Sequence, residues 1–313
     1  MLVLLVRRIV ATVPVLVIVA LIVFLMLRLA PGDPAAMIVG NSGTSADIAR
    51  VRAELGLNDS LPVQFTHWVG RLAQGDLGES YFMKMKVTHL IAQRIEPTVS
   101  LSLLTLLITI VVAIPLGVAA AWRHGGWLDR TLMGFSVLGF SIPSFVIGYL
   151  MIWAFALHWN WFPTQGYTRF SDDFWGWLHH LVLPAITLSI IYVALIARVT
   201  RAAVAEALTE DYIRTARAKG VSELRVLMRH ALANAAIPIV TVIGIGVALL
   251  IGGVVVTETV FAIPGLGQLT VDAVLSRDFP LIQAITLFFS VIYVMINLLV
   301  DLSYLVLDPR VRY

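Results

Sequence analysis

The chain has 313 residues, of which 59% are hydrophobic and 13% are charged, and its mean hydropathy is +0.90. A soluble domain carries about 25% charged residues, so this composition indicates a protein of the lipid bilayer. The absence of cysteine excludes disulfides, thiolate metal sites and a cysteine nucleophile, and a formal net charge of +3 is too small to indicate nucleic-acid binding.

Apolar segments with the length of a membrane span recur along the chain. A helix rises 1.5 Å per residue, so about 20 apolar residues cross the roughly 30 Å of hydrocarbon. The sequence therefore predicts an all-α, polytopic membrane protein with about six transmembrane helices. The predicted spans are Ile9–Leu29, Val99–Ala121, Thr131–Leu157, His180–Ala197, Pro238–Thr257 and Ala284–Leu307. The first exceeds the 7–15 apolar residues of a signal peptide, so we expect it to be retained.

The distribution of Lys and Arg predicts the orientation of these spans. Basic residues gather at both termini and in the second-to-third and fourth-to-fifth connections. They are Arg7, Arg8, Arg123, Arg130, Arg198, Arg201, Arg214, Arg217, Lys219, Arg225, Arg229, Arg310 and Arg312. By the positive-inside rule, these four segments lie in the cytoplasm, together with both termini. The two short opposite loops hold only Arg169 and Arg277 and therefore face outward.

The long loop between the first two spans, residues 30–98, is expected on the outer side. It carries several basic residues, but loops above about 60 residues are translocated largely regardless of charge. Pro31-Gly32-Asp33-Pro34 is a sequence that stops a helix. Short amphipathic helices are predicted over Ile48–Leu55, with Ser45 or Asp47 as its cap, and over Val63–Leu72. The loop is therefore expected to form a small ordered extracytoplasmic cap.

Charged residues are scarce inside the predicted spans. Arg28 and Glu258 fall at helix ends, where a long side chain reaches the interface, and Asp301 lies in the inner half of the last span. We expect interfacial or structural roles for all three. A phosphate-binding Walker loop requires a Gly-Lys step, and no lysine of this chain follows a glycine, so ATP hydrolysis by that route is excluded. No catalytic residue, cofactor site or metal site is predicted.

Prolines and glycines within the spans indicate where helices bend or approach closely. Pro115 is expected to bend the second span and Pro143 the third, because proline removes a backbone donor. Gly252 and Gly253 belong to a set of small residues in the fifth span that permit close helix packing. These four residues are candidates for a gate or helix bend, and packing alone is the alternative explanation for the glycines.

The fourth-to-fifth connection, residues 198–236, is the most specific feature of the sequence. Glu206–Asn234 is polar and predicts a helix-turn-helix outside the bilayer, in which Gly220 ends the first helix and Ser222 caps the second. Two interpretations remain open for this element. It is either an amphipathic hairpin that rests on anionic headgroups, or a docking element for a moving partner.

This connection resembles the cytoplasmic coupling segment of permease subunits from binding-protein-dependent ABC importers. The general family motif is Glu-Ala-Ala, three residues, then Gly; here Gly220 matches and Arg214-Thr215-Ala216 replaces Glu-Ala-Ala. The dipeptide and oligopeptide (and nickel) branch is more similar, and its first-permease, B-type subunits share the long first loop. The resembling blocks are Pro31–Pro34, Ser141–Phe145, Asp211–Gly220, Arg229–Pro238, Glu258–Leu269 and Arg277–Pro280.

The resemblance implies a type I ABC importer permease (MetI-like) fold, with residues 1–98 as first helix plus outer loop and 99–313 as a five-helix core. It implies half of a peptide pathway in a bacterial inner membrane, a second permease, two cytoplasmic ATPases that bind ATP and Mg, and an extracytoplasmic peptide-binding protein. The chain itself would be no enzyme. The implied ATPase-coupling residues are Asp211, Arg214, Thr215, Ala216, Arg217, Ala218, Lys219 and Gly220.

Other functions remain open from the sequence alone. Nickel, glutathione or another small solute could replace the peptide within the same family. An ATP-independent channel or carrier would favour inverted repeats or broken midplane helices, and we see no convincing internal repeat. An intramembrane enzyme would need a buried constellation of Ser, His, Asp or Glu on facing helices, which the sequence does not indicate.

Overall fold

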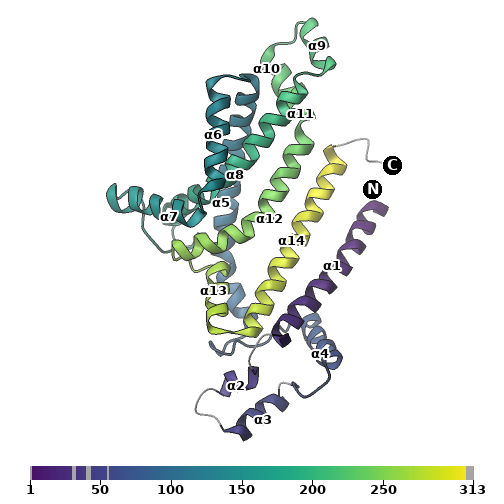
Figure 1. Ribbon diagram of the computed structural model, residues 1–313, viewed down its shortest axis with the longest axis vertical. Helices are drawn as coiled ribbons and strands as arrows, with labels where there is room; N and C mark the ends of the chain where they lie inside the picture. The colour runs from purple at the N-terminus through teal and green to yellow at the C-terminus, as the bar shows by residue number, and fades with distance from the viewer. Residues whose placement is uncertain (1, 30–32, 40–43, 55, 308–313) are drawn as a thin grey trace. The chain divides into compact units, whose positions relative to one another are not determined.

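The computed structural model describes residues 2–29, 33–39, 44–54 and 56–307, and every regular element among them is a helix (Figure 1). The predicted all-α fold is confirmed. The α-helices are α1 (Leu2–Leu29), α2 (Pro34–Val39), α3 (Ser45–Glu54), α4 (Leu61–Ala73), α5 (Val87–Trp122), α6 (Trp127–Ser141), α7 (Ser144–Met151), α8 (Phe174–Ala207), α9 (Asp211–Ala218), α10 (Glu223–Arg225), α11 (Leu232–Asn234), α12 (Ala236–Val260), α13 (Leu266–Ser276) and α14 (Phe279–Leu307). Two π-helices complete the set, η1 (Ile152–His158) and η2 (Val226–Ala231).

Four single helices in the described ranges are long and apolar enough to cross a membrane: α5, α8, α12 and α14. They contain the second, fourth, fifth and sixth predicted spans, and α1 contains the first. The predicted boundaries were too short, since α5 begins at Val87 rather than Val99 and α8 extends from Phe174 to Ala207. Polar turns continue both helices beyond their apolar stretches, which hydropathy alone does not detect.

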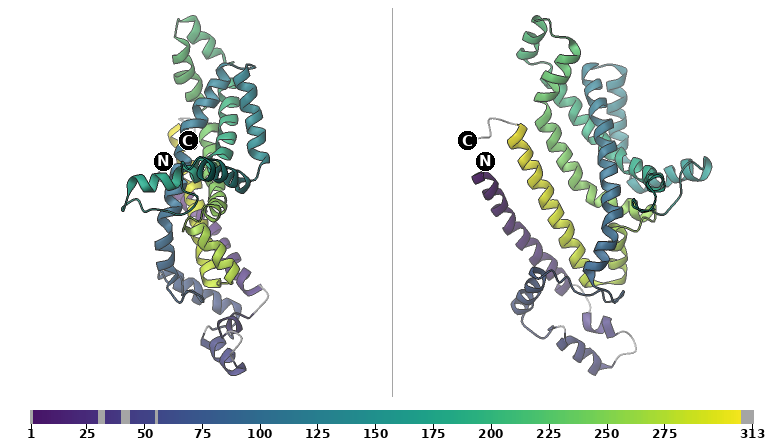
Figure 2. Two further views of the ribbon diagram at one scale, coloured as in Figure 1. Left: turned by 90° about the vertical axis from the view of Figure 1, so that its left-hand side faces the viewer. Right: turned by 180° about the vertical axis from the view of Figure 1, so that it is seen from behind.

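The third predicted span is two helices rather than one. α6 and the continuous pair α7–η1 meet at an angle of 103° (Figure 2). The break lies at Ile142, whose backbone is extended, and at Pro143, which precedes the first residue of α7. Proline disfavours the helical conformation of the residue before it, so the predicted bend at Pro143 becomes a sharp break.

The described chain divides into two compact units. Unit 1 comprises residues 1–5, 96–268 and 293–313, and unit 2 comprises residues 6–95 and 269–292. Within unit 1, α8 packs against α6, α7 and α12 and supplies many of the buried side chains, including Leu181, Leu188 and Ile196 (Figure 1). The hydroxyl of Ser136 on α6 donates to the carbonyl of Ala194 on α8 at 3.1 Å, which reflects the close approach of these helices.

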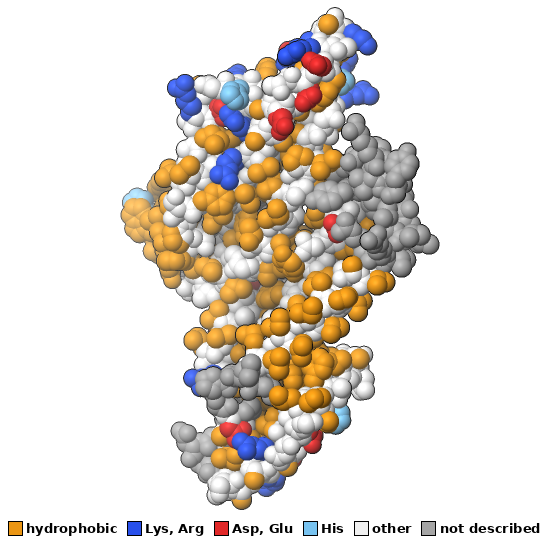
Figure 3. Space-filling model, turned by 45° about the vertical axis from the view of Figure 1, so that its right-hand side comes forward, with side chains coloured by type: hydrophobic (Ala, Val, Ile, Leu, Met, Phe, Trp, Pro, Cys, Tyr) orange, Lys and Arg blue, Asp and Glu red, His pale blue; other side chains and the backbone are white. Residues whose placement is uncertain are grey.

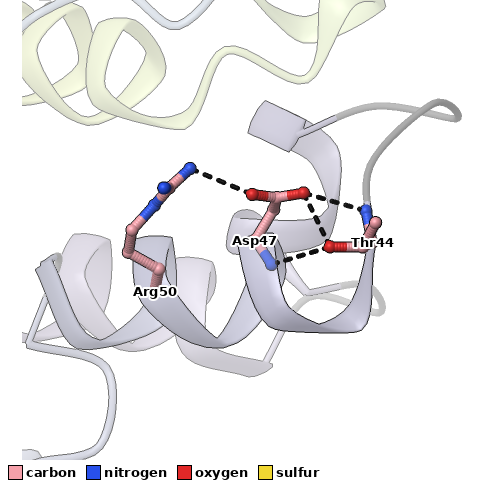
Figure 4. Close-up of polar contacts among 3 residues, drawn as sticks. All are labelled: Thr44, Asp47 and Arg50. Carbon is pink, nitrogen blue, oxygen red and sulfur yellow. Dashed lines mark hydrogen bonds and ion pairs between the residues drawn. The ribbon is translucent and has the colours of Figure 1, made fainter.

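Unit 2 contains the long first loop. There the structure corrects the predicted cap: the helix begins at Ser45, and Thr44 rather than Ser45 or Asp47 precedes it. Thr44 and Asp47 form a reciprocal capping box, in which the Asp47 carboxylate accepts the Thr44 hydroxyl at 2.7 Å and Thr44 Oγ1 accepts the Asp47 N–H at 3.2 Å (Figure 4). A threonine before the first turn and an acidic residue three positions later are typical of this motif.

Two further contacts order unit 2. Phe24 of α1 lies against Phe65 and Trp68 of α4, with ring centroids 5.3 and 5.7 Å apart. The buried carboxylate of Asp278 accepts the Ser80 hydroxyl and the backbone N–H of Tyr81 at 3.3 Å. The loop is therefore folded against two distant parts of its own unit. Some predicted features lie outside the description, namely Pro31, Gly32, Arg310, Arg312 and the side chains of Arg7, Arg8 and Arg28.

The two described acidic residues of the spans differ in their surroundings. Asp301 is half-buried, whereas Glu258 is fully buried with no exposed surface. The expectation that the Glu258 side chain reaches an interface was wrong. Its carboxylate instead receives a hydroxyl and backbone N–H groups, which satisfy the charge inside the protein. The role of Glu258 is therefore structural rather than interfacial.

Candidate functional site

The polar connection forms a hairpin over residues 211–234, made of α9, α10, η2 and α11; we call it the 211–234 hairpin. Gly220 has a φ of +73°, its N–H bonds to the carbonyl of Arg217 at 2.9 Å, and the N–H of Val221 bonds to that of Ala216 at 3.2 Å. This pair of bonds is a Schellman motif, so the predicted end of the first helix at Gly220 is confirmed.

Ser222 occupies the predicted N-cap position of the second helix. Its backbone is extended, and its carbonyl accepts the N–H of Val226 at 2.9 Å. Its side chain makes no capping hydrogen bond to any residue that the structure describes. The prediction was correct for the position and wrong for the side-chain contact.

The hairpin has an inward and an outward face. Ile213 and Ala216 are buried, and they belong to a cluster that includes Val118 of α5, Val204 of α8 and Val226 of η2. The other predicted coupling residues are exposed: Asp211, Arg214, Thr215, Arg217, Ala218, Lys219 and Gly220. Ala216 therefore packs inside this chain, and the remaining residues form the surface that a partner can reach.

Charged side chains dominate that surface, as Figure 3 shows for the end of unit 1 that carries α9 and α10, whereas the surface over the adjoining spans is mainly hydrophobic. Arg217 binds Glu223 across the turn through two contacts of 2.9 and 3.1 Å, and Arg214 pairs with Asp211 at 3.2 Å. Partial burial is the main cause that raises the pKa of Tyr212, while a hydrogen bond with Asn234 opposes this shift. Both of these ion pairs are thus formed within the hairpin itself.

A buried ion pair fixes the helices next to the hairpin. Arg201 of α8 donates to both carboxylate oxygens of Asp129 at the start of α6, at 2.8 and 2.7 Å. Asp129 also accepts the N–H of Gly125 at 2.9 Å, and its side chain is only 5% exposed. A bidentate pair of this kind sets both distance and orientation. It holds α6 and α8 in register beside the hairpin.

The four candidate gate or bend residues occupy different environments. α5 is assigned as one helix through Pro115, while Pro143 lies at the break before α7. A Cβ at Gly253 would lie 2.8 Å from Leu188 Cδ1 and from Tyr192 Oη, whereas a Cβ at Gly252 would meet nothing within 4 Å. Gly253 therefore permits close packing of α12 on α8. A gating role for any of these residues stays a prediction.

Two residues of the outward face escaped the sequence analysis. Leu224 is 71% exposed and Met228 is 51% exposed, although both are large and hydrophobic. They lie four positions apart, which places them on one side of a helical segment. That spacing, in a segment already predicted to lie outside the bilayer, was the available signal. Their exposed apolar surface is available for contact with another protein or with lipid headgroups.

Comparison with known families accounts for almost the whole chain. Residues 113–313 match the family described as binding-protein-dependent transport system inner membrane component, and residues 1–102 match the corresponding N-terminal family. Among solved structures, the chain is similar to the inward-facing methionine ABC transporter MetNI, with a TM-score of 0.60, 18% identity and coverage of 71% of this chain and 97% of the other. This likeness supports the fold alone.

Individual relatives align from end to end. A protein of Sinorhizobium fredii named as a probable peptide ABC transporter permease is 52% identical over 98% of both chains. A glutathione transport system permease protein of Pectobacterium atrosepticum is 44% identical over 98% of both chains. The chain therefore belongs to the family of inner membrane components of binding-protein-dependent transport systems, and is a multi-pass, non-catalytic permease subunit of an ABC importer with a MetI-like fold.

Proposed function

We propose that this permease carries short peptides and forms half of their pathway through the inner membrane. The observation that carries the proposal is the full-length identity of 52% with a relative named for peptide transport. The glutathione relative fits the same chemistry, since glutathione is itself a tripeptide. The chain would pair with a second permease, and an extracytoplasmic peptide-binding protein would deliver the substrate.

The outward face of the 211–234 hairpin is the proposed docking surface for one of two partner ATPases, which would bind ATP and Mg. Its local order supports this role, because the Schellman motif at Gly220 and the Arg217–Glu223 pair fix the turn without a partner. Leu224 and Met228 supply apolar contact area beside the charged residues. Ala216 would contribute indirectly, because its buried side chain packs α9 against the hydrophobic cluster of this chain.

We infer that the hairpin and both termini face the cytoplasm. Basic residues of the described chain concentrate in the connections on that side, and the positive-inside rule then puts the loop of residues 30–98 outside. In this orientation residues 99–313 would form the transporting core. Pro143, Gly252 and Gly253 would then act where helices bend or slide, as alternating access requires, and Pro115 would do so within α5.

Purification of the intact chain from its native membrane, with its natural partners, tests the docking surface. We expect an ATPase to accompany the wild-type protein and to be lost with Ala218→Glu and with Leu224→Glu, because each change adds a charge to the outward face. Ala92→Glu is the matched control, since Ala92 is exposed on α5 and distant in sequence from the hairpin. Retention of the ATPase by both hairpin variants would refute this docking surface.

A transport assay separates the substrate classes. The purified complex, reconstituted with its binding protein in ATP-loaded liposomes, is offered a library of di- to pentapeptides, reduced glutathione and nickel chloride. Import of the peptides supports the proposal. Import restricted to glutathione or to nickel would change the proposed substrate but leave the assignment as an ATP-driven importer intact. Uptake without ATP would refute the proposal that ATP drives the transport.

A further inference from the structure

A fully buried carboxylate lies at the opposite end of α12 from the 211–234 hairpin. Glu258 Oε1 accepts the hydroxyl of Thr98 at 2.6 Å, and Glu258 Oε2 accepts the backbone N–H groups of Gly267 at 2.7 Å and of Gln268 at 3.1 Å. Thr98 Oγ1 in turn accepts the N–H of Leu266 at 2.7 Å. We call this arrangement the Glu258 node; it joins α5, α12 and the start of α13.

The node is built for a charged acceptor. Each of these contacts brings a donor to Glu258, and two come from the first turn of α13, where the helix dipole favours negative charge. Hydrogen bonds to a charged acceptor are stronger than those between neutral groups. A buried donor that loses its acceptor costs a large desolvation free energy. The node therefore resists opening once it has formed.

Two glycines near the start of α13 let the backbone approach the Glu258 carboxylate closely. A Cβ at Gly265 would overlap the carboxylate of Glu258, and a Cβ at Gly267 would lie 2.5 Å from the Cα of Val255. Phe261 and Ile263, in the turn between α12 and α13, are also buried. The segment between α12 and α13 thus packs closely around the Glu258 carboxylate, which links α5, α12 and α13.

α12 connects this node to the hairpin. Ala235, which precedes α12, and Ile239 in its first turn belong to the cluster that buries Ile213 and Ala216, while Glu258 lies near the last residue of α12. A 25-residue helix is about 37 Å long, so α12 is long enough to reach from one membrane face to the other. One continuous helix therefore links the cluster beneath the hairpin to the Glu258 node.

We propose that Glu258 is a positioning residue that couples movement of the hairpin to the far end of the pathway. Because its carboxylate holds Thr98 and the first turn of α13, a tilt of α12 carries both of these with it. Without the carboxylate, α12 would still respond to the ATPase, but Thr98 and the first turn of α13 would not follow. The inference rests on the proposed function, since it requires a partner ATPase to move the hairpin.

The test compares Glu258→Gln, Thr98→Val and Thr98→Ser in the complete transporter, reconstituted with its binding protein. Glu258→Gln keeps the shape of the side chain but replaces one accepting oxygen with an NH2 group, which then faces hydrogen-bond donors. Thr98→Val keeps the shape of the threonine and removes its hydroxyl. Thr98→Ser is the control, because it retains the hydroxyl. Uptake of the di- to pentapeptide library and ATP hydrolysis are measured per assembled complex. The decisive quantity is the ratio of peptide imported to ATP hydrolysed, because a loss of folded complex alone lowers both together.

We expect Glu258→Gln to lower this ratio about tenfold and Thr98→Val to lower it less, while Thr98→Ser keeps it near the wild-type value. An unchanged ratio in Glu258→Gln would refute the coupling role. If Glu258→Gln fails to assemble, an unchanged ratio in Thr98→Val has the same force. Failure of the proposed function has a different signature: the wild-type complex would then import no peptide at the expense of ATP.

Discussion

The 211–234 hairpin and the Glu258 node are fixed by contacts of opposite kinds. The hairpin is exposed and ordered by neighbours in sequence, as in the Arg217–Glu223 pair and the turn at Gly220. The node is buried and joins residues far apart, since Thr98 and Glu258 are separated by 160 positions. Exposure suits the docking role proposed for the hairpin, and burial of linked distant residues suits the coupling role proposed for the node.

The same contrast exists between the ion pairs. Asp129 and Arg201 are largely buried and lie on different helices, whereas Asp211 and Arg214 lie within one turn of α9 and are highly exposed. Exposed pairs contribute little because water and salt screen them, while a buried charge depends on its partner. Contacts between helices should therefore dominate stability, and local contacts should mainly shape the surface.

The largest effect is expected at the buried pair. Asp129→Ala leaves Arg201 without its carboxylate and should destabilise the chain by about 3–5 kcal/mol, whereas Asp211→Ala should change stability by less than about 0.5 kcal/mol. Unfolding of the purified chain in detergent measures both. The double variant Asp129→Leu, Arg201→Met should recover much of the loss. Equal destabilisation by the two single alanine variants would break the distinction between buried and exposed pairs.

Adjacent glycines provide a second, smaller contrast. Gly253→Ala should destabilise by about 1–3 kcal/mol, because its Cβ would press on Leu188 and Tyr192 of α8. Gly252→Ala meets open space, and the better helix propensity of alanine should stabilise α12 by up to about 1 kcal/mol. Thermal unfolding of the two variants side by side tests this. A similar loss of stability in both variants would mean that the packing of α12 against α8 does not distinguish the two glycines.

The sequence predicted features that depend on neighbouring residues. Apolar runs located the spans, the glycine at position 220 located the end of α9, and Pro143 located the break before α7. In each case the signal lies within a few residues of the structure it causes. The motif spanning Glu258–Leu269 was also visible, but only as a resemblance and without a physical role.

Features that depend on distant residues were missed. Glu258 is buried because Thr98 and the start of α13 come together around it, and no local pattern encodes that meeting. Likewise, Ala216 points inward because α5 and α8 supply a cluster for it, although its neighbours Thr215 and Arg217 are exposed. The angle of 103° between α6 and α7 also depends on packing, since proline sets only where a helix breaks.

The Arg217–Glu223 pair tests how much a local contact adds to the hairpin. Both side chains are about half exposed, at 42% and 50%, so a double-mutant cycle with alanine should give a coupling free energy of about 0.5 kcal/mol. Hydrogen exchange of the α9 and α10 amides is the suitable measurement, because it reports local opening. The coupling should largely vanish in 1 M salt, where screening acts over about 3 Å. Persistence at high salt would indicate a buried, long-range contribution instead.

The smallest expected effect is a pH dependence confined to α3. Hydrogen bonds from Thr44, chiefly from its hydroxyl, lower the pKa of Asp47 below its ordinary value of 3.8 (Figure 4). Because the folded pKa is depressed, the capping box contributes its full stability above pH 3.8 and loses it as the pH falls through the folded value. Amide exchange of α3 should therefore accelerate below pH 3.8, after correction for intrinsic rates, and Asp47→Asn should abolish this pH dependence.

α4 is the internal control, since its N-cap Ser60 makes no side-chain cap within the described residues. Parallel acceleration in α3 and α4 would show that acid loosens the whole loop of residues 30–98, and that this local contact does not act independently of the long-range ones.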